Sequence, residues 1–325
     1  MKKTVLVTGG AGFIGSHICN MYLAEGYQTI CVDNLISGKE ANIAELMNHP
    51  SFHFYKVDIS NKAEMEALFV KFRPQVVNHH AAQKSVPYSL ENPIYDLDTN
   101  IGGLLQLLAL VQKYPIETFV FASSGGALSK KLEGDERSAE KDTPQLISPY
   151  ALTKYAGEQY INIYSEKYDF DYTVLRYANV FGPKQVPDGE SGVVPIFLKN
   201  LNENKKSVLM AYPDMPRGCT RDYIYVADVV EANKLATQKP LNKVVNIGSG
   251  TEISILDVYE QVLDIFGKSE PIEIIGPRPG DIRRSILDTK IATEELNWKA
   301  KYTLRQGLQE LYTFNLKWDK ELTFR

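Results

Sequence analysis

The feature that most constrains the fold is a set of three glycines at three-residue spacing near the start of the chain. Residues 4–7 are Thr-Val-Leu-Val, an apolar and β-branched run that predicts a buried strand. Gly9, Gly12 and Gly15 follow, and an apolar helical pattern begins among them. A strand, a glycine turn and a helix in this order are typical of a corner that binds a dinucleotide. We expect Gly9 to make the turn, Gly12 to admit the pyrophosphate and Gly15 to let the helix pack closely.

An acidic residue after the second predicted strand indicates which dinucleotide is bound. Residues 28–33 form another apolar run, and it ends in Asp33, about 20 residues after the glycines. A carboxylate there accepts hydrogen bonds from the ribose hydroxyls of adenosine and repels a 2′-phosphate. The glycine spacing alone would also suit a plain turn, but its combination with Asp33 favours NAD binding.

The first half of the chain alternates predicted strands with predicted helices. The strands are expected at 4–8, 28–33, 52–57, 75–79, 117–122 and 172–177, and the helices at 13–25, 61–72, 93–113 and 149–168. This alternation predicts an α/β fold with a Rossmann-type, doubly wound parallel sheet. Ligands are then expected beyond the carboxyl ends of the strands.

The composition changes after residue 178. Residues 179–192 are rich in Gly and Pro and predict a long loop, and 275–284 predict a second one. A strand leading into a helix is expected over 223–235, a strand over 243–247, and helices within 252–267 and 289–315. We therefore expect two interleaved domains. The NAD-binding domain would comprise residues 1–177 and 222–249. A smaller substrate domain would comprise residues 178–221 and 250–325.

Composition excludes several classes of function. The chain has 325 residues, of which 44% are hydrophobic and 23% charged, and its net charge is −4. These values are ordinary for a globular protein and disfavour a nucleic-acid partner. Cys19, Cys31 and Cys219 show no paired spacing, and the sequence contains no 18-residue apolar run, so we expect a cytoplasmic protein with no membrane partner. His79 and His80 are adjacent in a predicted strand and point to opposite faces, so no metal site is predicted.

Small and polar residues follow the other predicted strands. Asp58 ends the third strand, where it could reach the adenine or could cap the helix that begins near residue 61. Ala81 and Ala82 follow the fourth strand and would let a cofactor lie against the backbone. Ser123 and Ser124 end the fifth strand.

Tyr150 and Lys154 lie four residues apart at the start of a predicted helix. Side chains at this spacing share one helix face. A nearby ammonium group and a positively charged nicotinamide ring would both favour the phenolate, so we expect the pKa of Tyr150 to be lowered toward neutrality. The alternative is that Tyr150 and Lys154 are an ordinary pair on the surface. A catalytic pair is favoured because the glycine turn, Asp33 and then Ser123 and Ser124 precede it in the chain.

The chain as a whole resembles the NAD-dependent epimerase/dehydratase family of extended short-chain dehydrogenases/reductases, and within it the UDP-glucose 4-epimerase type. The matching motifs cover nearly the whole chain: TGGAGFIGSH, VDN, KVDI, HAAQKSV, FASSGGA, SPYALTK, LRYANVFGP, GVVPIF, TRDYIYVADV, VVNIGSG and RPGDIRRS. The resemblance implies a catalytic triad of Ser124, Tyr150 and Lys154. It implies NAD-dependent 4-epimerisation of a UDP-hexose through a 4-keto intermediate, with the cofactor tightly bound.

The resemblance also implies further binding residues. Those expected at the cofactor are Gly9, Gly12, Phe13, Ile14, Gly15, Asp33, Asn34, Asp58, Ile59, Ala81, Ala82, Asn100, Ser123, Tyr150, Lys154 and Tyr177. Those expected at the UDP-sugar are Lys84, Ser124, Asn179, Val194, Arg221, Arg278, Asp281 and Ser285. Arginine suits the diphosphate because its guanidinium donates hydrogen bonds in pairs. A homodimer through helices 93–113 and 149–168 is expected on the same ground.

Three other functions compete with this interpretation. A nucleotide-sugar dehydratase or decarboxylase of the family carries an acid just after the catalytic serine, where this chain has Gly125 and Gly126. A UDP-glucuronate 4-epimerase would place an arginine near Val186, which cannot pair with a carboxylate. A non-catalytic NAD-binding regulator would bind cofactor without turnover, and the intact triad argues against it.

Two positions bear on the sugar pocket. Ser129 and Lys130 stand where the family usually has an aromatic residue and a glycine, and a charged insert over 131–137, expected to be a solvated loop, follows. Ser285 is small at a position that is often bulky and aromatic in relatives restricted to plain hexoses. Acceptance of UDP-GlcNAc and UDP-GalNAc beside UDP-glucose and UDP-galactose is therefore expected.

Overall fold

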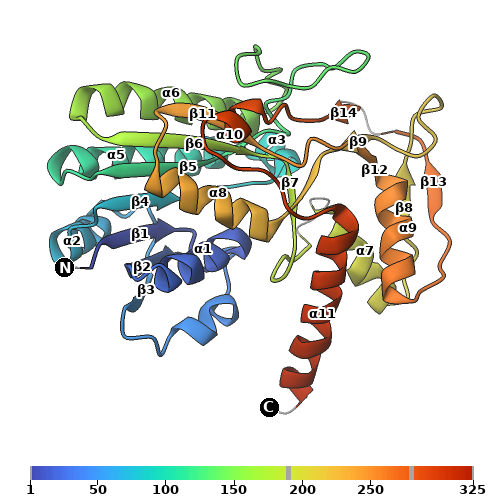
Figure 1. The fold of residues 1–325 in the computed structure, drawn as a ribbon, viewed down its shortest axis with the longest axis horizontal. Coiled ribbons are helices and arrows are strands. Elements are labelled where there is room, and N and C mark those ends of the chain that lie inside the picture. Colours follow the sequence, from blue (N-terminus) through green and yellow to red (C-terminus); the bar gives the residue numbers. More distant parts are fainter. Residues whose placement is uncertain (1, 188–191, 278–281, 324–325) are drawn as a thin grey trace.

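A sheet of seven parallel strands forms the centre of the molecule, in the order β11-β6-β5-β4-β1-β2-β3 (Figure 1). The computed structural model describes residues 2–187, 192–277 and 282–323. The strands of this sheet are β1 (Thr4–Thr8), β2 (Gln28–Asp33), β3 (Phe52–Lys56), β4 (Val76–His79), β5 (Thr118–Ser124), β6 (Asp171–Tyr177) and β11 (Lys243–Ile247). The chain order reverses at β1, which pairs with both β2 and β4. The predicted doubly wound sheet is confirmed, and its switch point lies beyond β1 and β4.

Helices cover both faces of the sheet because its strands are apolar on both sides. Val5 and Val7 pack with residues of α1, whereas Leu6 between them packs with residues of α2 and α5. The longer helices around the sheet are α1 (Phe13–Ala24), α2 (Lys62–Phe72), α5 (Gly103–Lys113), α6 (Pro149–Tyr168) and α8 (Val226–Gln238). Helices α1 and α8 pack together on one face, and α2, α5 and α6 lie on the other. Shorter helical segments are η1 (Glu40–Leu46), α3 (Val86–Glu91), α4 (Pro93–Leu97), η2 (Asp98–Gly102) and α10 (Lys290–Glu294).

A second group of elements lies beyond one end of this sheet (Figure 1). Its strands are β7 (Asn179–Phe181), β8 (Val208–Met210), β9 (Thr220–Arg221), β10 (Tyr223–Tyr225), β12 (Ile253–Ser254), β13 (Glu273–Ile275) and β14 (Arg284–Ser285). Its helices are α7 (Val193–Asn202), α9 (Ile255–Phe266) and α11 (Leu304–Thr323). A separate core containing Phe181, Phe197 and Tyr259 holds these elements together.

Local hydrogen bonding explains where elements differ from expectation. The predicted helix over 93–113 is a continuous helical run, but residues 98–102 within it form a π-helical turn. The helical region expected over 289–315 is interrupted between α10 and α11. There the carboxylate of Asp228 accepts hydrogen bonds from the backbone N–H groups of Lys301 and Tyr302, which holds that segment outside a helix.

Several short elements were not predicted. The loop expected over 179–192 begins with β7, and Arg221 lies in the two-residue strand β9. Two- and three-residue strands carry too little hydrophobic periodicity to be recognised from sequence. In the described part of the chain, none of the helices combines the length and apolar character needed to span a bilayer.

Candidate active site

The glycine turn joins β1 to α1 with very little space. Gly9 has φ +67°, which favours glycine, and a Cβ there would lie 2.7 Å from the backbone nitrogen of Ala81. A Cβ on Gly15 would lie 2.1 Å from the carbonyl oxygen of Gly9, so only glycine lets the helix approach this closely. Gly12 differs, because the one atom near its missing side chain is the Gly9 carbonyl oxygen at 3.1 Å.

The amino end of α1 has the features of an anion site. Its N-cap residue is Gly12, and no side chain caps the first turn. The N–H groups of that turn, which begins with Phe13 and Ile14, therefore gain no hydrogen bond from a side chain of the N-cap residue. An uncapped first turn of a 12-residue helix next to a strand switch point fits a pyrophosphate.

Asp33 faces the same turn from the end of β2. Its Oδ2 accepts a hydrogen bond from the Ala11 N–H at 3.0 Å, and its Oδ1 accepts one from the Leu35 N–H at 2.8 Å. Burial raises the pKa of Asp33, and hydrogen bonds from the backbone N–H groups of Leu35, Ala11 and Gly12 oppose that shift. A carboxylate has about four acceptor positions, so one remains for a ribose hydroxyl. The residues present thus fit a dinucleotide without a 2′-phosphate.

Asp58 lies beside this acid and is not a helix cap. Its carboxylate accepts hydrogen bonds from Asn34 Nδ2 at 2.7 Å and from the Ser60 N–H at 2.8 Å. Helix α2 is instead capped by Asn61, whose side chain accepts from the Glu64 N–H. The capping alternative for Asp58 is therefore wrong, and the adenine contact stays a prediction.

The loop after β4 links the glycine turn to α6. The Ala81 N–H donates to Thr8 Oγ1 at 3.2 Å, and the Gln83 N–H donates to Asn100 Oδ1 at 2.8 Å. Asn100 is buried, and its Nδ2 also contacts Thr153 Oγ1 at 3.2 Å. The role seen for Asn100 is to hold this loop, which includes Ala82 and Lys84, against α6. Lys84 is exposed.

Ile59, the residue after Asp58, is buried against α5. A Cβ on Gly103 would lie 2.5 Å from Ile59 Cδ1, so the helix passes directly over this side chain. Ile59 therefore packs against the start of α5, and its contact with the cofactor stays a prediction.

Tyr150 and Lys154 stand where expected, on the first turns of α6. Ser148 caps this helix by accepting the Ala151 N–H at 3.1 Å, and Pro149 occupies its first position. The Tyr150 hydroxyl is hydrogen-bonded to Ser124. Lys154 Nζ donates to the carbonyl oxygen of Ala122 at 2.9 Å. The structure thus brings the three residues of the predicted triad together at the carboxyl end of β5.

The expected lowering of the Tyr150 pKa is not seen in the protein alone. Burial raises the pKa of Tyr150 to about 12, although the hydrogen bond from Ser124 opposes this. Burial lowers the pKa of Lys154 to about 8. The prediction considered Lys154 and the nicotinamide ring but not the burial of the phenol, which disfavours its charged form. Positive charge placed beside the phenol would oppose this shift.

Ser123 faces away from this group, as the alternation of side chains along a strand requires. Its hydroxyl donates to Glu158 Oε1 at 2.5 Å, and Glu158 is paired with Arg176 at 2.6 Å, both buried. The Ser123 side chain is therefore committed to an internal ion pair. Glu158 was missed in the sequence, although it lies four residues beyond Lys154 on the same helix face.

Tyr177 at the end of β6 anchors a buried polar chain. Its hydroxyl contacts His80 Nε2 at 3.0 Å and accepts from Asn233 Nδ2 at 2.8 Å. Burial and the Lys154 charge lower the pKa of His80 to about 3, so this imidazole is neutral. Neither His79 nor His80 belongs to a group of possible metal ligands among the described residues.

Of the residues predicted to bind the substrate diphosphate and sugar, the structure describes Asn179 and Arg221 but not Arg278 and Asp281. Asn179 Nδ2 donates to the Asp222 carbonyl oxygen at 3.1 Å. Arg221 Nη1 donates to the Thr220 carbonyl oxygen at 2.8 Å. No carboxylate pairs with Arg221 within the described ranges. Arg278 and Asp281 lie outside the described residues.

Val194 and Ser285 are both buried. The Val194 side chain is 1% exposed and packs in the core of the second group of elements, and its predicted place at the substrate stays a prediction. Ser285 Oγ lies 2.9 Å from Ser129 Oγ, which also donates to the Gly125 carbonyl oxygen. A Cβ on Gly126 would be 3.9 Å from Ser285 Oγ and 4.0 Å from Asn179 Nδ2, which are ordinary contact distances, so these two polar side chains lie next to Gly126.

The charged insert over 131–137 is a mostly exposed loop, as predicted, and it is attached to the protein at Gly134 and at Ser138, the residue that follows it. Ser138 forms a β-bridge with Leu287, and its N–H donates to the Ile286 carbonyl oxygen at 2.8 Å. Arg284 donates to the Gly134 carbonyl oxygen at 2.6 Å and pairs with Glu252 at 2.8 Å. The segment is thus attached to the strand that carries Ser285.

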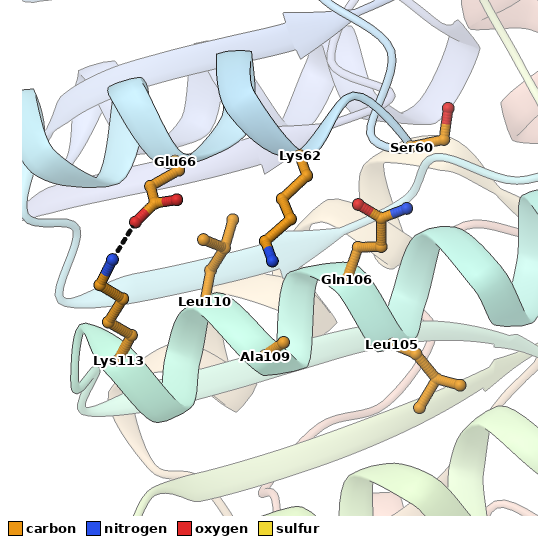
Figure 2. Close-up of a pocket in the computed structure, with 8 residues that line it drawn as sticks. All are labelled: Ser60, Lys62, Glu66, Leu105, Gln106, Ala109, Leu110 and Lys113. Carbon is orange, nitrogen blue, oxygen red and sulfur yellow. Dashed lines mark hydrogen bonds and ion pairs between the residues drawn. The ribbon is translucent and has the colours of Figure 1, made fainter.

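A separate hollow of about 570 Å³ lies between α2 and α5 (Figure 2). Leu105, Gln106 and Leu110 of α5 line it, and the Glu66–Lys113 ion pair lies at one end. None of the predicted site residues lines this hollow.

Comparisons with known proteins agree with this arrangement. Residues 5–248 match the model of the NAD dependent epimerase/dehydratase family. A putative UDP-glucose 4-epimerase of Methanocaldococcus jannaschii is 39% identical over 308 residues, which cover 94% of this chain and 96% of the relative.

Solved structures of UDP-glucose 4-epimerases are also similar to this chain. The UDP-glucose 4-epimerase of Thermotoga maritima, determined with UDP-glucose, has a TM-score of 0.90 and 40% identity, covering 97% of this chain and 99% of that one. The UDP-glucose 4-epimerase of Thermus thermophilus, determined with NAD, has a TM-score of 0.88 and 39% identity, covering 96% of this chain and 98% of that one.

Proposed function

Because the chain belongs to the NAD-dependent epimerase/dehydratase family, we propose that it is a UDP-sugar 4-epimerase that interconverts UDP-glucose and UDP-galactose. The observation that carries the proposal is the meeting of Ser124, Tyr150 and Lys154 at the end of β5. The loop after β4 connects this group to the glycine turn through Ala81 and Asn100. A proton-transfer group and a dinucleotide site therefore share one edge of the sheet.

NAD would be held by the uncapped turn at Gly12 and by Asp33, with Gly9 and Gly15 fixing the backbone between them. When bound, NAD supplies a hydride acceptor and, in its oxidised form, a positively charged ring. The chain's own residues supply the remainder of the reaction, namely binding, orientation and proton transfer.

Tyr150 is proposed to take the proton of the sugar's 4-hydroxyl and to return it after the sugar has turned over. Ser124, already hydrogen-bonded to the phenol, would orient both oxygens. Positive charge near the phenol would lower the pKa of Tyr150 from its raised value, so Lys154 is proposed to act while its ammonium is charged. A pKa of about 8 for Lys154 keeps most of that charge at neutral pH.

The glycines after Ser124 favour epimerisation over dehydration. A dehydratase needs a side-chain acid or base for the carbon next to the reacting one, and Gly125 and Gly126 offer none. Asn179 and Ser285, which are nearest to Gly126, are neutral. Val186 likewise offers no charge for the carboxylate of a glucuronate.

The small residues at positions 126 and 285 support a wider substrate range. Ser285 is small, and a Cβ added to Gly126 would meet no described heavy atom closer than 3.9 Å beyond its chain neighbours. We therefore propose that UDP-GlcNAc and UDP-GalNAc are also interconverted. Residues 178–221 and 250–325 are proposed as the substrate domain, and a homodimer through α4–α5 and α6 stays a prediction.

The direct test is to incubate purified protein with a panel of UDP-sugars, without added cofactor, and to identify epimeric products. Conversion of UDP-glucose to UDP-galactose is expected, together with NAD released on denaturation. Formation of a 4-keto-6-deoxy sugar, or NAD release without any turnover, would overturn the proposal in favour of a dehydratase or a regulator.

A further inference from the structure

A buried carboxylate stands beside Tyr150 and Lys154, and no role proposed above uses it. Asp96 in α4 has an exposed fraction of 0%. Its Oδ1 accepts hydrogen bonds from Gln83 Nε2 at 2.6 Å and Asn100 Nδ2 at 3.2 Å. Its Oδ2 accepts one from Thr153 Oγ1 at 2.7 Å. All three partners donate, so both oxygens serve as acceptors, as those of a carboxylate do.

The contacts of Asp96 connect three parts of the site. Gln83 belongs to the loop after β4, Asn100 to the π-helical turn η2, and Thr153 to α6, between Tyr150 and Lys154. π-Helical turns within helices are frequent at functional sites. Here the turn brings Asn100 into contact with both Asp96 and Thr153. Asp96 is therefore the point at which this loop and the catalytic helix are joined.

The charge of Asp96 has no ion-pair partner within residues 2–187, 192–277 and 282–316. Burying a carboxylate without a partner is unfavourable, and such groups persist where another charge nearby benefits from them. The nearby cation is Lys154, and the charge of Asp96 favours its ammonium form by opposing the effect of burial on the pKa of Lys154. The same charge also raises the pKa of the Tyr150 phenol, so the benefit of Asp96 to the reaction acts through Lys154.

The other groups that face Lys154 do not replace this charge. Glu158, on the next turn of α6, also favours the ammonium but is already paired with Arg176. His79 and His80 on β4 are buried and neutral, because burial and the Lys154 charge lower their pKa values. Asp96 is thus the negative group near Lys154 that no cation among the described residues neutralises.

We propose that Asp96 is a positioning residue whose buried charge keeps the Lys154 ammonium protonated during the reaction. This inference rests on the proposed function for the role of Lys154. It assigns a purpose to a side chain whose hydrogen-bond partners are Gln83, Asn100 and Thr153 and not members of the triad. It also explains why the hydrogen-bond network under the loop is built around an acid.

The substitution Asp96→Asn separates the charge from the network. An asparagine keeps one oxygen for Gln83 and Asn100 and presents an amide group to Thr153. Thr153 Oγ1 lies 3.1 Å from the Tyr150 carbonyl oxygen, so its proton can turn there while it accepts from the amide. The shape and number of hydrogen bonds are therefore retained. Asp98→Asn removes an exposed carboxylate two residues away and is the matched control.

The test measures Lys154 directly and then through the reaction. Lysine labelled with carbon-13 is titrated by NMR in the full chain, with Lys154→Met to assign the signal. In the wild type, Lys154 is expected to be charged at pH 7. Asp96→Asn is expected to lower the pKa of Lys154 and to move the alkaline limb of the pH–rate profile to lower pH. Asp98→Asn is expected to change neither.

Three results would overturn the inference. The first is an unchanged titration of Lys154 in Asp96→Asn. The second is a loss of rate that is equal at every pH and accompanied by a lower unfolding midpoint, which indicates a structural role. The third, which needs no variant, is a Lys154 that is already neutral at pH 7 in the wild type. Absence of all UDP-sugar turnover by the wild type would refute the proposed function instead, and the NMR titration would still decide the role of Asp96.

Discussion

The ion pair between Glu158 and Arg176 gives a prediction whose size follows from its burial. Arg176 Nε donates to Glu158 Oε1 at 2.8 Å, and its Nη2 donates to Oε2 at 2.6 Å. The Arg176 side chain is 5% exposed and that of Glu158 is 0% exposed. Removing one partner of a buried pair leaves the other charge without compensation, which costs about 3–5 kcal/mol. Glu158→Ala is therefore expected to lower the free energy of unfolding by about that amount.

A matched exposed pair provides the control. Lys3 and Glu117 form an ion pair in which the side chains are 57% and 54% exposed. Glu117→Ala removes the same carboxylate from a solvated site, so a loss of about 0–1 kcal/mol is expected. Denaturant unfolding of both variants measures the difference. The double variant Glu158→Ala with Arg176→Met is expected to be less destabilised than the sum of the single variants.

Two outcomes would refute this reasoning. One is a loss for Glu158→Ala that is no larger than that for Glu117→Ala. The other is full additivity in the double variant, which would show that the two charges do not depend on each other. Since Ser123 also donates to Glu158, part of the loss is expected to persist in the double variant.

The remaining predictions concern the glycine turn and the sugar pocket. Gly15→Ala places a Cβ 2.1 Å from the Gly9 carbonyl oxygen, so α1 must move. We expect loss of bound NAD and a destabilisation of about 1–3 kcal/mol, and unchanged NAD content in this variant would contradict the assignment. Gly26→Ala cannot serve as the control, because the φ of +83° at Gly26 is itself unfavourable for alanine. Ser285→Tyr is expected to reduce turnover of UDP-GlcNAc relative to UDP-glucose by at least about tenfold. Ser285→Ala is the control and should leave the ratio of the two turnover rates unchanged. If this ratio is the same in both variants, the position does not limit the N-acetyl group.

The sheet and the order of the site residues could be predicted because both are local properties of the sequence. Apolar runs gave the seven strands of the sheet within a few residues, and the glycine spacing located the turn at Gly9. The family was recognisable for the same reason, since its motifs are short and contiguous.

What could not be predicted depends on contacts between distant segments. Asp96 accepts a hydrogen bond from Thr153, and Asp222 accepts one from the Ser249 N–H at 2.8 Å. No rule of sequence spacing indicates either pair. The raised pKa of Tyr150 was missed because burial is set by tertiary packing and not by the neighbouring lysine. Glu158 is the exception, since its position one turn beyond Lys154 is visible in the sequence.

The central claim is that the Tyr150 hydroxyl transfers the proton in a reaction that uses NAD. It is tested most directly by comparing wild type and Tyr150→Phe for conversion of UDP-glucose to UDP-galactose, with bound NAD measured in both. We predict that the variant keeps its NAD and loses about 100-fold or more of the rate, the usual contribution of a general base. A variant that converts the sugar as fast as the wild type would contradict the account.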